Sequence, residues 1–186
     1  LRNPLRIIDV TDFFQRCSFK PFHNKTVRAI KIHAELSKGF HEKLLEYAMS
    51  IGMGGLGYLE IQEDMSYKGP IDKFIPEELK KELAQIAGLI PGDVIFFIAD
   101  KENLACKYAG LIRNELGKRL DICEKSAYRF CYVNDFPMYE IDEETGKIQF
   151  THNPFSMPQG GLEALNSKDP LDILAYQYDI VCNGVE

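Results

Sequence analysis

Apolar and polar residues alternate along several short segments of this chain, and this alternation predicts β-strands. Residues 26–35 (TVRAIKIHAE) place apolar side chains between basic ones, so we expect a strand with one face in the core and one in solvent. Residues 58–62 (YLEIQ) predict a second strand, and the glycines at 54–57 before it predict a turn. Residues 93–100 (DVIFFIAD) form a continuous apolar run, which is typical of a buried central strand.

Apolar residues that recur at intervals of three and four predict helices between these strands. We expect one helix over residues 40–51, with Ser37 as its N-cap. A second helix is expected over residues 77–89, after a proline that suits a first helical position. Residues 101–120 predict a longer amphipathic helix, in which Gly110 marks close packing against a neighbouring element.

A shorter helix is expected over residues 7–14, with Thr11 or Asp9 as its N-cap. Between residues 26 and 120 the predicted elements then follow the order strand, helix, strand, helix, strand, helix. This regular order predicts a two-layer α+β unit with a core of its own.

The pattern changes after residue 127. Residues 128–142 (YRFCYVNDFPMYEID) predict a long aromatic strand, residues 142–146 an acidic turn, and residues 147–155 (KIQFTHNPF) a strand that returns antiparallel. Because a lone hairpin is only marginally stable in water, we expect it to belong to a larger antiparallel sheet whose other strands lie elsewhere.

Composition excludes several classes of protein. The chain has 186 residues, 45% hydrophobic and 27% charged, and no run approaches the roughly 18 apolar residues that a membrane span needs. Five cysteines without a CxxC pair, and four scattered histidines, argue against a disulfide framework and a zinc site. We therefore expect a cytoplasmic protein without a membrane partner. The first residues carry no signal sequence, and we expect them to be an internal part of a longer chain.

Charge is distributed unevenly along the chain. Residues 1–31 carry seven Lys or Arg against two Asp, a net of +5, and residues 132–186 carry ten Asp or Glu against two Lys, a net of −8. The basic segment has the charge needed to contact phosphate groups, and a solvated surface is the alternative. The acidic segment disfavours nucleic acid unless a divalent cation is bound there.

Two carboxylates near the end of the sequence, Asp179 and Glu186, have the chemistry to share a magnesium ion, because Mg²⁺ prefers oxygen ligands. Their odd separation of seven residues places them on opposite faces of a regular strand. A β-bulge at the Asn-Gly pair of residues 183–184 would restore a common face. The alternative is that both are ordinary solvated acids.

His152 follows a predicted strand and precedes an Asn-Pro pair. A strand end beside such a loop is a common place for binding residues, and a structural role is the alternative. Spacing reveals neither a nucleophile–base arrangement nor a phosphate-binding glycine motif. The residues alone therefore predict no complete catalytic site.

Two blocks of the sequence, NDFPMYEIDEETGKIQFTHNPFSMP (134–158) and YDIVCNGVE (178–186), resemble the bacterial-type aspartyl-tRNA synthetases, which are class II enzymes. The middle of the chain, with GLGYLEIQ, KGPIDKF and GDVIFFIAD, resembles the GAD domain inserted into their catalytic domain. The resemblance covers nearly the whole chain. It implies a linker from the catalytic domain at residues 1–25, a GAD insert domain at 26–125 and part of the catalytic domain at 126–186.

The resemblance also implies chemistry and site residues. Enzymes of this family join aspartate to ATP with Mg²⁺, transfer the aspartyl group to the terminal ribose of tRNA, and work as homodimers. Position by position, Glu186 matches a residue that contacts ATP and magnesium, Asp179 one that shares the magnesium, and His152 one that contacts the substrate aspartate. This chain has Asn153 where many bacterial relatives have a second histidine.

Other parts of the family pattern are absent from this sequence, namely the anticodon-binding barrel, the dimer-forming segment, an arginine on the ATP phosphates and a glycine-rich block. We therefore expect the isolated chain to be inactive. An alternative is a non-catalytic tRNA-binding or scaffolding GAD module, as in a tRNA-dependent amidotransferase subunit, although FTHNPF and YDIVCNGVE have no role there. An unrelated metabolic α+β enzyme is a further alternative.

Overall fold

The computed structural model describes residues 1–142, 144–151 and 153–185. The chain divides into two compact units, one formed by residues 3–123 and the other by residues 1–2 together with 124–186. Residues 7–15, inside the segment expected to be a linker, form a strand and a helix of the first unit.

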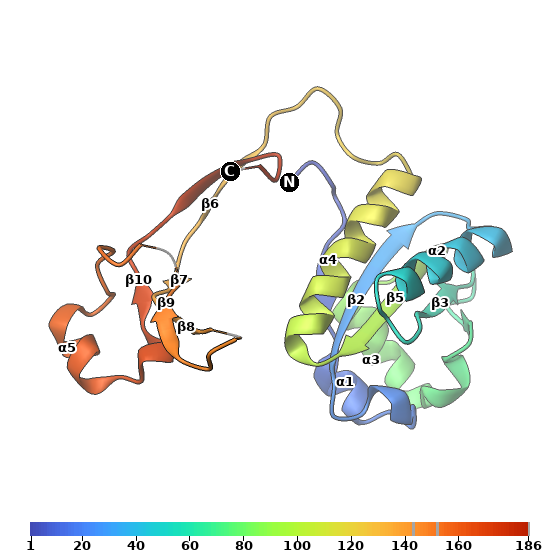
Figure 1. Ribbon diagram of the computed structural model, residues 1–186. Coiled ribbons are helices and arrows are strands. Elements are labelled where there is room, and N and C mark those ends of the chain that lie inside the picture. Colours follow the sequence, from blue (N-terminus) through green and yellow to red (C-terminus); the bar gives the residue numbers. More distant parts are fainter. Residues whose placement is uncertain (143, 152, 186) are drawn as a thin grey trace. The chain divides into compact units, whose positions relative to one another are not determined.

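The first unit is built on a five-stranded antiparallel sheet (Figure 1). The strands are β1 (Ile7–Asp9), β2 (Thr26–His33), β3 (Gly57–Ile61), β4 (Tyr67–Lys68) and β5 (Asp93–Asp100). Their order across the sheet is β1-β2-β5-β3-β4, so β5 is central, as its apolar sequence predicted. Phe96 of β5 lies opposite Ile30 of β2 on one side and opposite Tyr58 of β3 on the other.

Helices cover both faces of this sheet, which differs from the expected two-layer unit. Helices α2 (Lys38–Ser50) and α4 (Glu102–Arg119) pack on one face, and α1 (Thr11–Gln15) and α3 (Glu77–Ala87) on the other. The reason lies in β5, where every residue from 93 to 98 is buried. Since successive side chains of a strand point to opposite faces, a strand buried at each position needs cover on both sides.

Residues of the first core face come from β2, β5, α2 and α4: Ile30, Ile32, Leu44, Ala48, Val94, Phe96, Ile98, Tyr108, Ile112 and Leu116. Those of the second come from β2, β3, β5, α1 and α3: Val27, Ala29, Leu59, Ile95, Phe97, Phe13, Phe14, Leu83 and Ala87. The two sets alternate along β2 and β5, so the sheet separates two hydrophobic cores.

Local signals in the sequence predicted the helix ends well. The Ser37 hydroxyl accepts a hydrogen bond from the backbone N–H of Phe40 at 3.2 Å, which confirms the predicted N-cap of α2. Gly88 ends α3 in the left-handed conformation, with φ of +58°. Such a residue lets the last carbonyl groups of a helix find partners, and glycine adopts it without steric cost.

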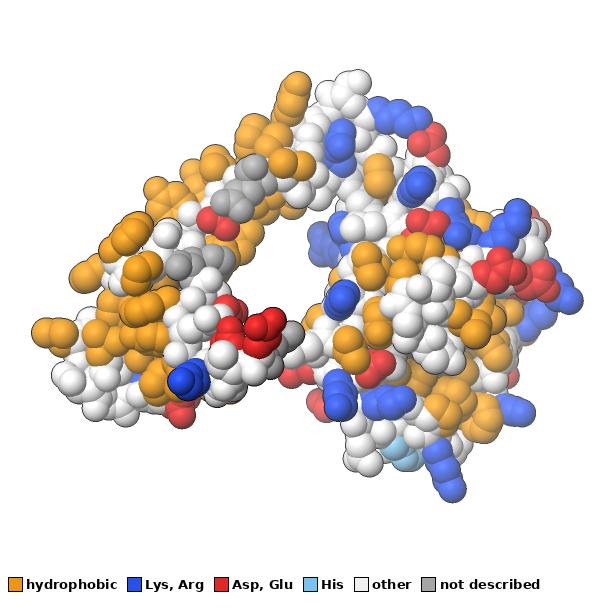
Figure 2. Space-filling model, in the orientation of Figure 1, with side chains coloured by type: hydrophobic (Ala, Val, Ile, Leu, Met, Phe, Trp, Pro, Cys, Tyr) orange, Lys and Arg blue, Asp and Glu red, His pale blue; other side chains and the backbone are white. Residues whose placement is uncertain are grey.

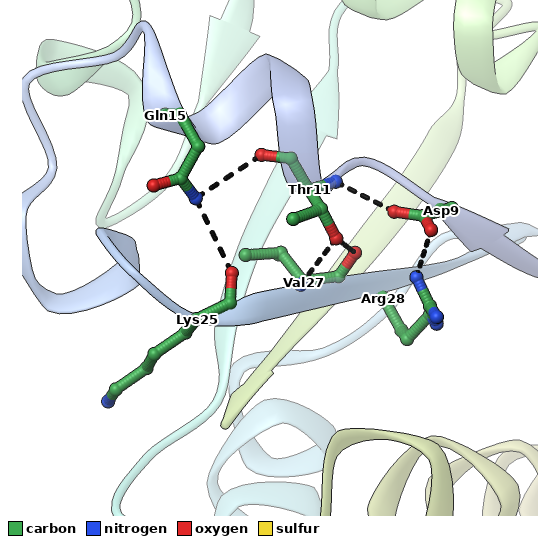
Figure 3. Close-up of polar contacts among 6 residues, drawn as sticks. All are labelled: Asp9, Thr11, Gln15, Lys25, Val27 and Arg28. Carbon is green, nitrogen blue, oxygen red and sulfur yellow. Dashed lines mark hydrogen bonds and ion pairs between the residues drawn. The ribbon is translucent and has the colours of Figure 1, made fainter. Parts of the chain in front are cut away.

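The helix predicted over residues 7–14 is wrong in its first half, because Ile7–Asp9 pairs with β2 as an edge strand. The Asp9 carboxylate accepts a hydrogen bond from the N–H of Thr11 at 2.9 Å and forms an ion pair with Arg28 (Figure 3). The Thr11 hydroxyl accepts the N–H of Val27 at 3.0 Å. These contacts fasten the turn between β1 and α1 to β2, and tertiary pairing overrides the local helical pattern.

The close-packed glycine of α4 is Gly117 and not Gly110 as predicted. A Cβ atom added to Gly117 would clash with the Asn3 amide nitrogen and lie 2.9 Å from Asn3 Cγ and 3.0 Å from the Cys123 sulfur, whereas nothing lies within 4 Å of one at Gly110. Asn3 donates a hydrogen bond to the Arg113 carbonyl at 2.8 Å, and the Arg113 guanidinium donates to the Asn3 carbonyl at 2.7 Å. Both ends of the unit therefore meet at one point of α4.

These two glycines give opposite predictions. Gly117→Ala should lower the free energy of unfolding by about 1–3 kcal/mol, because the added methyl group overpacks the contact. Gly110→Ala should raise it by about 0.5–1 kcal/mol, because alanine is the better helix former in open space. Urea unfolding of both variants beside the unchanged chain tests this, and equal effects of the two substitutions would contradict the assignment.

Burial of Cys17 predicts a loss of stability at alkaline pH. Burial raises the pKa of the Cys17 thiol from 9.0 to about 11. Because the folded state holds this proton more tightly than the unfolded state, its stabilisation is complete below pH 9 and is lost as the pH rises through about 11. Cys17→Ala should make the free energy of unfolding less dependent on pH between about 9 and 11. Cys106→Ala, at an exposed position, is the control and should leave this dependence unchanged. Thermal unfolding at several pH values measures both.

In the described residues of the second unit, the strands form three short antiparallel ladders. They pair β6 (Phe130–Val133) with β11 (Asp179–Cys182), β7 (Phe136–Pro137) with β10 (Leu174–Ala175), and β8 (Tyr139–Ile141) with β9 (Ile148–Phe150). A helix, α5 (Gly161–Ser167), lies between β9 and β10 in the chain. The β8–β9 ladder confirms the predicted hairpin.

The long aromatic strand that was predicted is interrupted in the structure at Asp135, whose φ is +58°. Its first part, β6, pairs with the last strand of the chain instead of continuing into the hairpin. Left-handed backbone ends regular strand geometry, and aspartate is one of the few non-glycine residues that adopts it readily. No helix among the described residues is long and apolar enough to cross a membrane.

Candidate functional site

Asp179 is the one predicted site residue that the structure describes. It begins β11 and lies opposite Val133 of β6. By strand alternation it shares a face with Val181 and Cys131, where exposure is intermediate. Within the described part of the chain, no hydrogen bond or ion pair engages its carboxylate, which is therefore available to a ligand.

The opposite face of the same ladder is apolar and exposed. Phe130, Tyr132 and Ile180 are 64%, 63% and 54% exposed, and the ring of Tyr178 meets that of Tyr132 edge-on at 5.8 Å. Hydrophobic side chains dominate this part of the surface in Figure 2. Monomeric proteins seldom leave so many large apolar side chains together in water, so this face has the character of an interface.

The β-bulge that would place Asp179 on a common face with residue 186 is not present at residues 183–184, where Asn183 and Gly184 form a two-residue hairpin turn. Their φ angles are +55° and +89°, and Cys182 and Val185 exchange backbone hydrogen bonds of 2.8 and 3.0 Å across them. Asn-Gly favours this turn because both positions need positive φ. The Asn183 side chain also accepts the N–H of Arg129 at 3.0 Å, which fixes the turn to the start of β6.

His152 and Glu186 lie outside the described residues, so their predicted roles stay predictions. The segment after His152, residues 153–159, is fastened to the segment that leads to Asp179. Met157 accepts the N–H of Tyr176 at 2.8 Å, and the Ser156 hydroxyl lies 3.2 Å from the Gln177 side-chain oxygen. The structure therefore brings the flanks of two predicted site residues side by side.

The carboxylate of Asp179 is chemically suited to bind magnesium. Mg²⁺ typically takes one or two protein carboxylates and completes its shell with water and phosphate, so a single free carboxylate at a strand end is a suitable ligand. In the described residues, no group of three or more His, Cys, Asp and Glu side chains is arranged to hold a metal ion.

A cavity of about 920 Å³ lies in the first unit, and the sequence did not predict it. One wall carries Asp93, which is 1% exposed and lies 2.9 Å from the imidazole of His33 and 3.1 Å from the ammonium of Lys31. On another wall, His41 stacks on Tyr58 with ring centroids 4.0 Å apart. The sequence contains no sign of this arrangement, because His33 and Asp93 are far apart in the chain and are brought together by the pairing of β2 with β5.

Three of the seven basic side chains in segment 1–31 form ion pairs within the first unit. Arg16 pairs with Glu82, Arg28 with Asp9, and Lys31 with Asp93. The Arg16 pair lowers the pKa of the Glu82 carboxyl through the hydrogen bond between them. The net charge of this segment therefore overstates its positive potential.

Asp93 is predicted to stabilise the end of the sheet. Besides Lys31 and His33, it accepts the backbone N–H of Ile90 at 3.0 Å. Asp93→Ala should lower the free energy of unfolding by about 1–3 kcal/mol, because it removes the shared acceptor of three hydrogen bonds. Glu63→Ala, an exposed acid on the rim of the same cavity, is the control and should change it little. Chemical denaturation measures both, and a neutral Asp93→Ala would contradict the assigned role.

Comparison with known proteins identifies the class of the first unit. Residues 20–109 match the GAD domain family, as the resemblance predicted. The match covers β2, β3, β4, β5 and the helices between them, together with the beginning of α4.

Over its whole length, the chain is similar to aspartate–tRNA ligases. It is 48% identical to the aspartate–tRNA(Asp/Asn) ligase of Ehrlichia chaffeensis, 50% identical to that of Gluconobacter oxydans and 49% identical to the aspartate–tRNA ligase of Streptomyces coelicolor. Each alignment covers 100% of this chain and 32–33% of the relative. The resemblance stated from the sequence is confirmed, and the chain spans about a third of the length of the curated relatives it matches.

Proposed function

We propose that this chain is part of an aspartate–tRNA ligase, which activates aspartate with ATP and transfers it to tRNA. The observation that carries the proposal is the extent of the similarity. A GAD module alone would account for residues 20–109, but identity of 46–50% extends over the complete chain, including the blocks around His152 and Asp179. This disfavours the alternative of a non-catalytic GAD module.

The domain assignment follows from the same proposal. Residues 26–125 form the GAD insert domain together with β1 and α1, which lie in the segment expected to be a linker and pack against β2, and residues 126–186 form part of a class II catalytic domain. The hydrogen bond from the N–H of Glu124 to the Arg2 carbonyl, at 2.9 Å, supports this arrangement, because it joins the chain just before residue 3 to the chain just after residue 123. The ligase works in the cytoplasm as a homodimer.

Activation of aspartate by ATP suits a site that is rich in carboxylates and poor in nucleophilic side chains. The aspartate carboxylate attacks the α-phosphorus of ATP, the bond to the bridging oxygen breaks, and pyrophosphate leaves. No covalent enzyme intermediate is needed, so the protein acts by orientation and by electrostatic stabilisation. Mg²⁺ supplies positive charge to the phosphates when bound, and Asp179 and Glu186 are the residues that would hold it. His152 orients the substrate aspartate, and Glu186 also contacts ATP.

Aspartate-dependent exchange of pyrophosphate into ATP tests the proposal in the full-length ligase. We expect exchange with aspartate and a loss of at least about a hundredfold in Glu186→Ala and Asp179→Ala, since each removes negative charge that holds the cation. The control is Glu163→Ala, an exposed acid on α5, which should retain full activity.

The isolated chain of 186 residues should show no exchange. Activity in the isolated chain would contradict the view that its catalytic part is incomplete. Absence of exchange with every amino acid in the full-length protein would favour the binding-module alternative.

A further inference from the structure

Asp135 lies where one strand changes partners. Before it, β6 pairs with β11, the strand that begins with Asp179, and after it β7 pairs with β10. Its φ of +58° makes this change of direction possible. Of the twenty amino acids, Gly, Asn and Asp tolerate that conformation best, so backbone geometry alone does not explain why a carboxylate is present.

The carboxylate of Asp135 has a specific partner, the side-chain amide of Gln159. The Gln159 Nε2 donates a hydrogen bond to Asp135 Oδ1 at 2.8 Å and a longer one to the Ala175 carbonyl at 3.3 Å. The backbone N–H of Gln159 also donates to the Leu174 carbonyl at 2.8 Å. One residue thereby joins the strand junction at 135 to β10.

Gln159 also ends the segment that follows His152. The neighbouring Pro158 forms a β-bridge with Ala175, and Met157 accepts the N–H of Tyr176. The hydrogen bond between Gln159 and Asp135 therefore joins this segment to the strand junction, which lies next to the β6–β11 ladder. The hydrogen bond of 2.8 Å restrains the spacing between them.

We infer that Asp135 and Gln159 are positioning residues that set the distance between the segment after His152 and the ladder that carries Asp179, and that they thereby determine the affinity for aspartate. This inference rests on the proposed function. Neither residue touches the reacting atoms. Misplacing the segment should weaken binding of the amino acid and leave binding of ATP and the chemical step largely intact.

Four variants of the full-length ligase separate the hydrogen bond from the backbone conformation. Asp135→Gly keeps the left-handed backbone and removes the acceptor, whereas Asp135→Asn keeps both. Gln159→Glu sets two carboxylates against each other. In the double variant Asp135→Asn with Gln159→Glu, the amide introduced at position 135 donates to the carboxylate introduced at position 159, so donor and acceptor are exchanged.

We expect Asp135→Gly and Gln159→Glu to raise the KM for aspartate by about fivefold to tenfold in pyrophosphate exchange, with kcat and the KM for ATP within about twofold. Asp135→Asn should leave the KM for aspartate near its original value. The double variant should bring the KM back from the raised value of Gln159→Glu to near the original one. The bond to the Ala175 carbonyl is lost in both variants that carry Gln159→Glu, so the difference between these two reports the contact between positions 135 and 159 alone.

Unchanged KM for aspartate in Asp135→Gly and Gln159→Glu would overturn the inference while leaving the proposed function standing. A uniform loss of kcat, of ATP affinity and of melting temperature, without recovery in the double variant, would also overturn it, because that pattern marks a merely structural contact. A full-length ligase without aspartate-dependent exchange would overturn the proposed function and this inference with it.

Discussion

The first unit depends on the burial of one strand on both of its faces. Phe96 and Phe97 of β5 are each 1% exposed although they point to opposite sides, and each side chain contributes roughly 1.5–3 kcal/mol of hydrophobic stabilisation. Neither contribution exists unless a helix covers the corresponding face. The positions of α1, α2, α3 and α4 therefore follow from the composition of a single strand, and a change in β5 would affect both cores.

Covering both faces also determines where the unit begins and ends. Helix α4 must run along β2 and β5, and its last turns bring Gly117 against Asn3 at the start of the unit and Cys123 at its end. A unit whose two ends meet can be inserted between neighbouring residues of another domain without distorting it. Here Arg2 and Glu124 are already hydrogen-bonded to each other just outside the ends.

The sequence predicted features that depend on local chemistry and missed those that depend on distant partners. Ser37 caps α2 as expected, because capping involves residues three positions apart. Gly110 and Gly117 look alike within the helix, and the positions of Asn3 and Cys123 distinguish them. The strand break at Asp135 had a local signal in Pro137, two residues later, which the predicted long strand did not take into account. The Asn-Gly pair at 183–184 is a typical turn sequence, but the sequence did not reveal that the preceding strand, β11, pairs with β6.

The candidate site shows the same limit more strongly. No spacing rule links His152 with Asp179, and only resemblance connected them; the structure adds that their flanking segments are hydrogen-bonded. Their unit has a small core, centred on Met138, Ile173 and Ala175, and it leaves aromatic side chains of β6 exposed. Three two-stranded ladders with so little buried surface gain little stability by themselves. In the proposed ligase, burial of these aromatic side chains against the remaining catalytic domain would both stabilise the ladders and hold Asp179 in place, so folding of this unit and assembly of the active site would be one event.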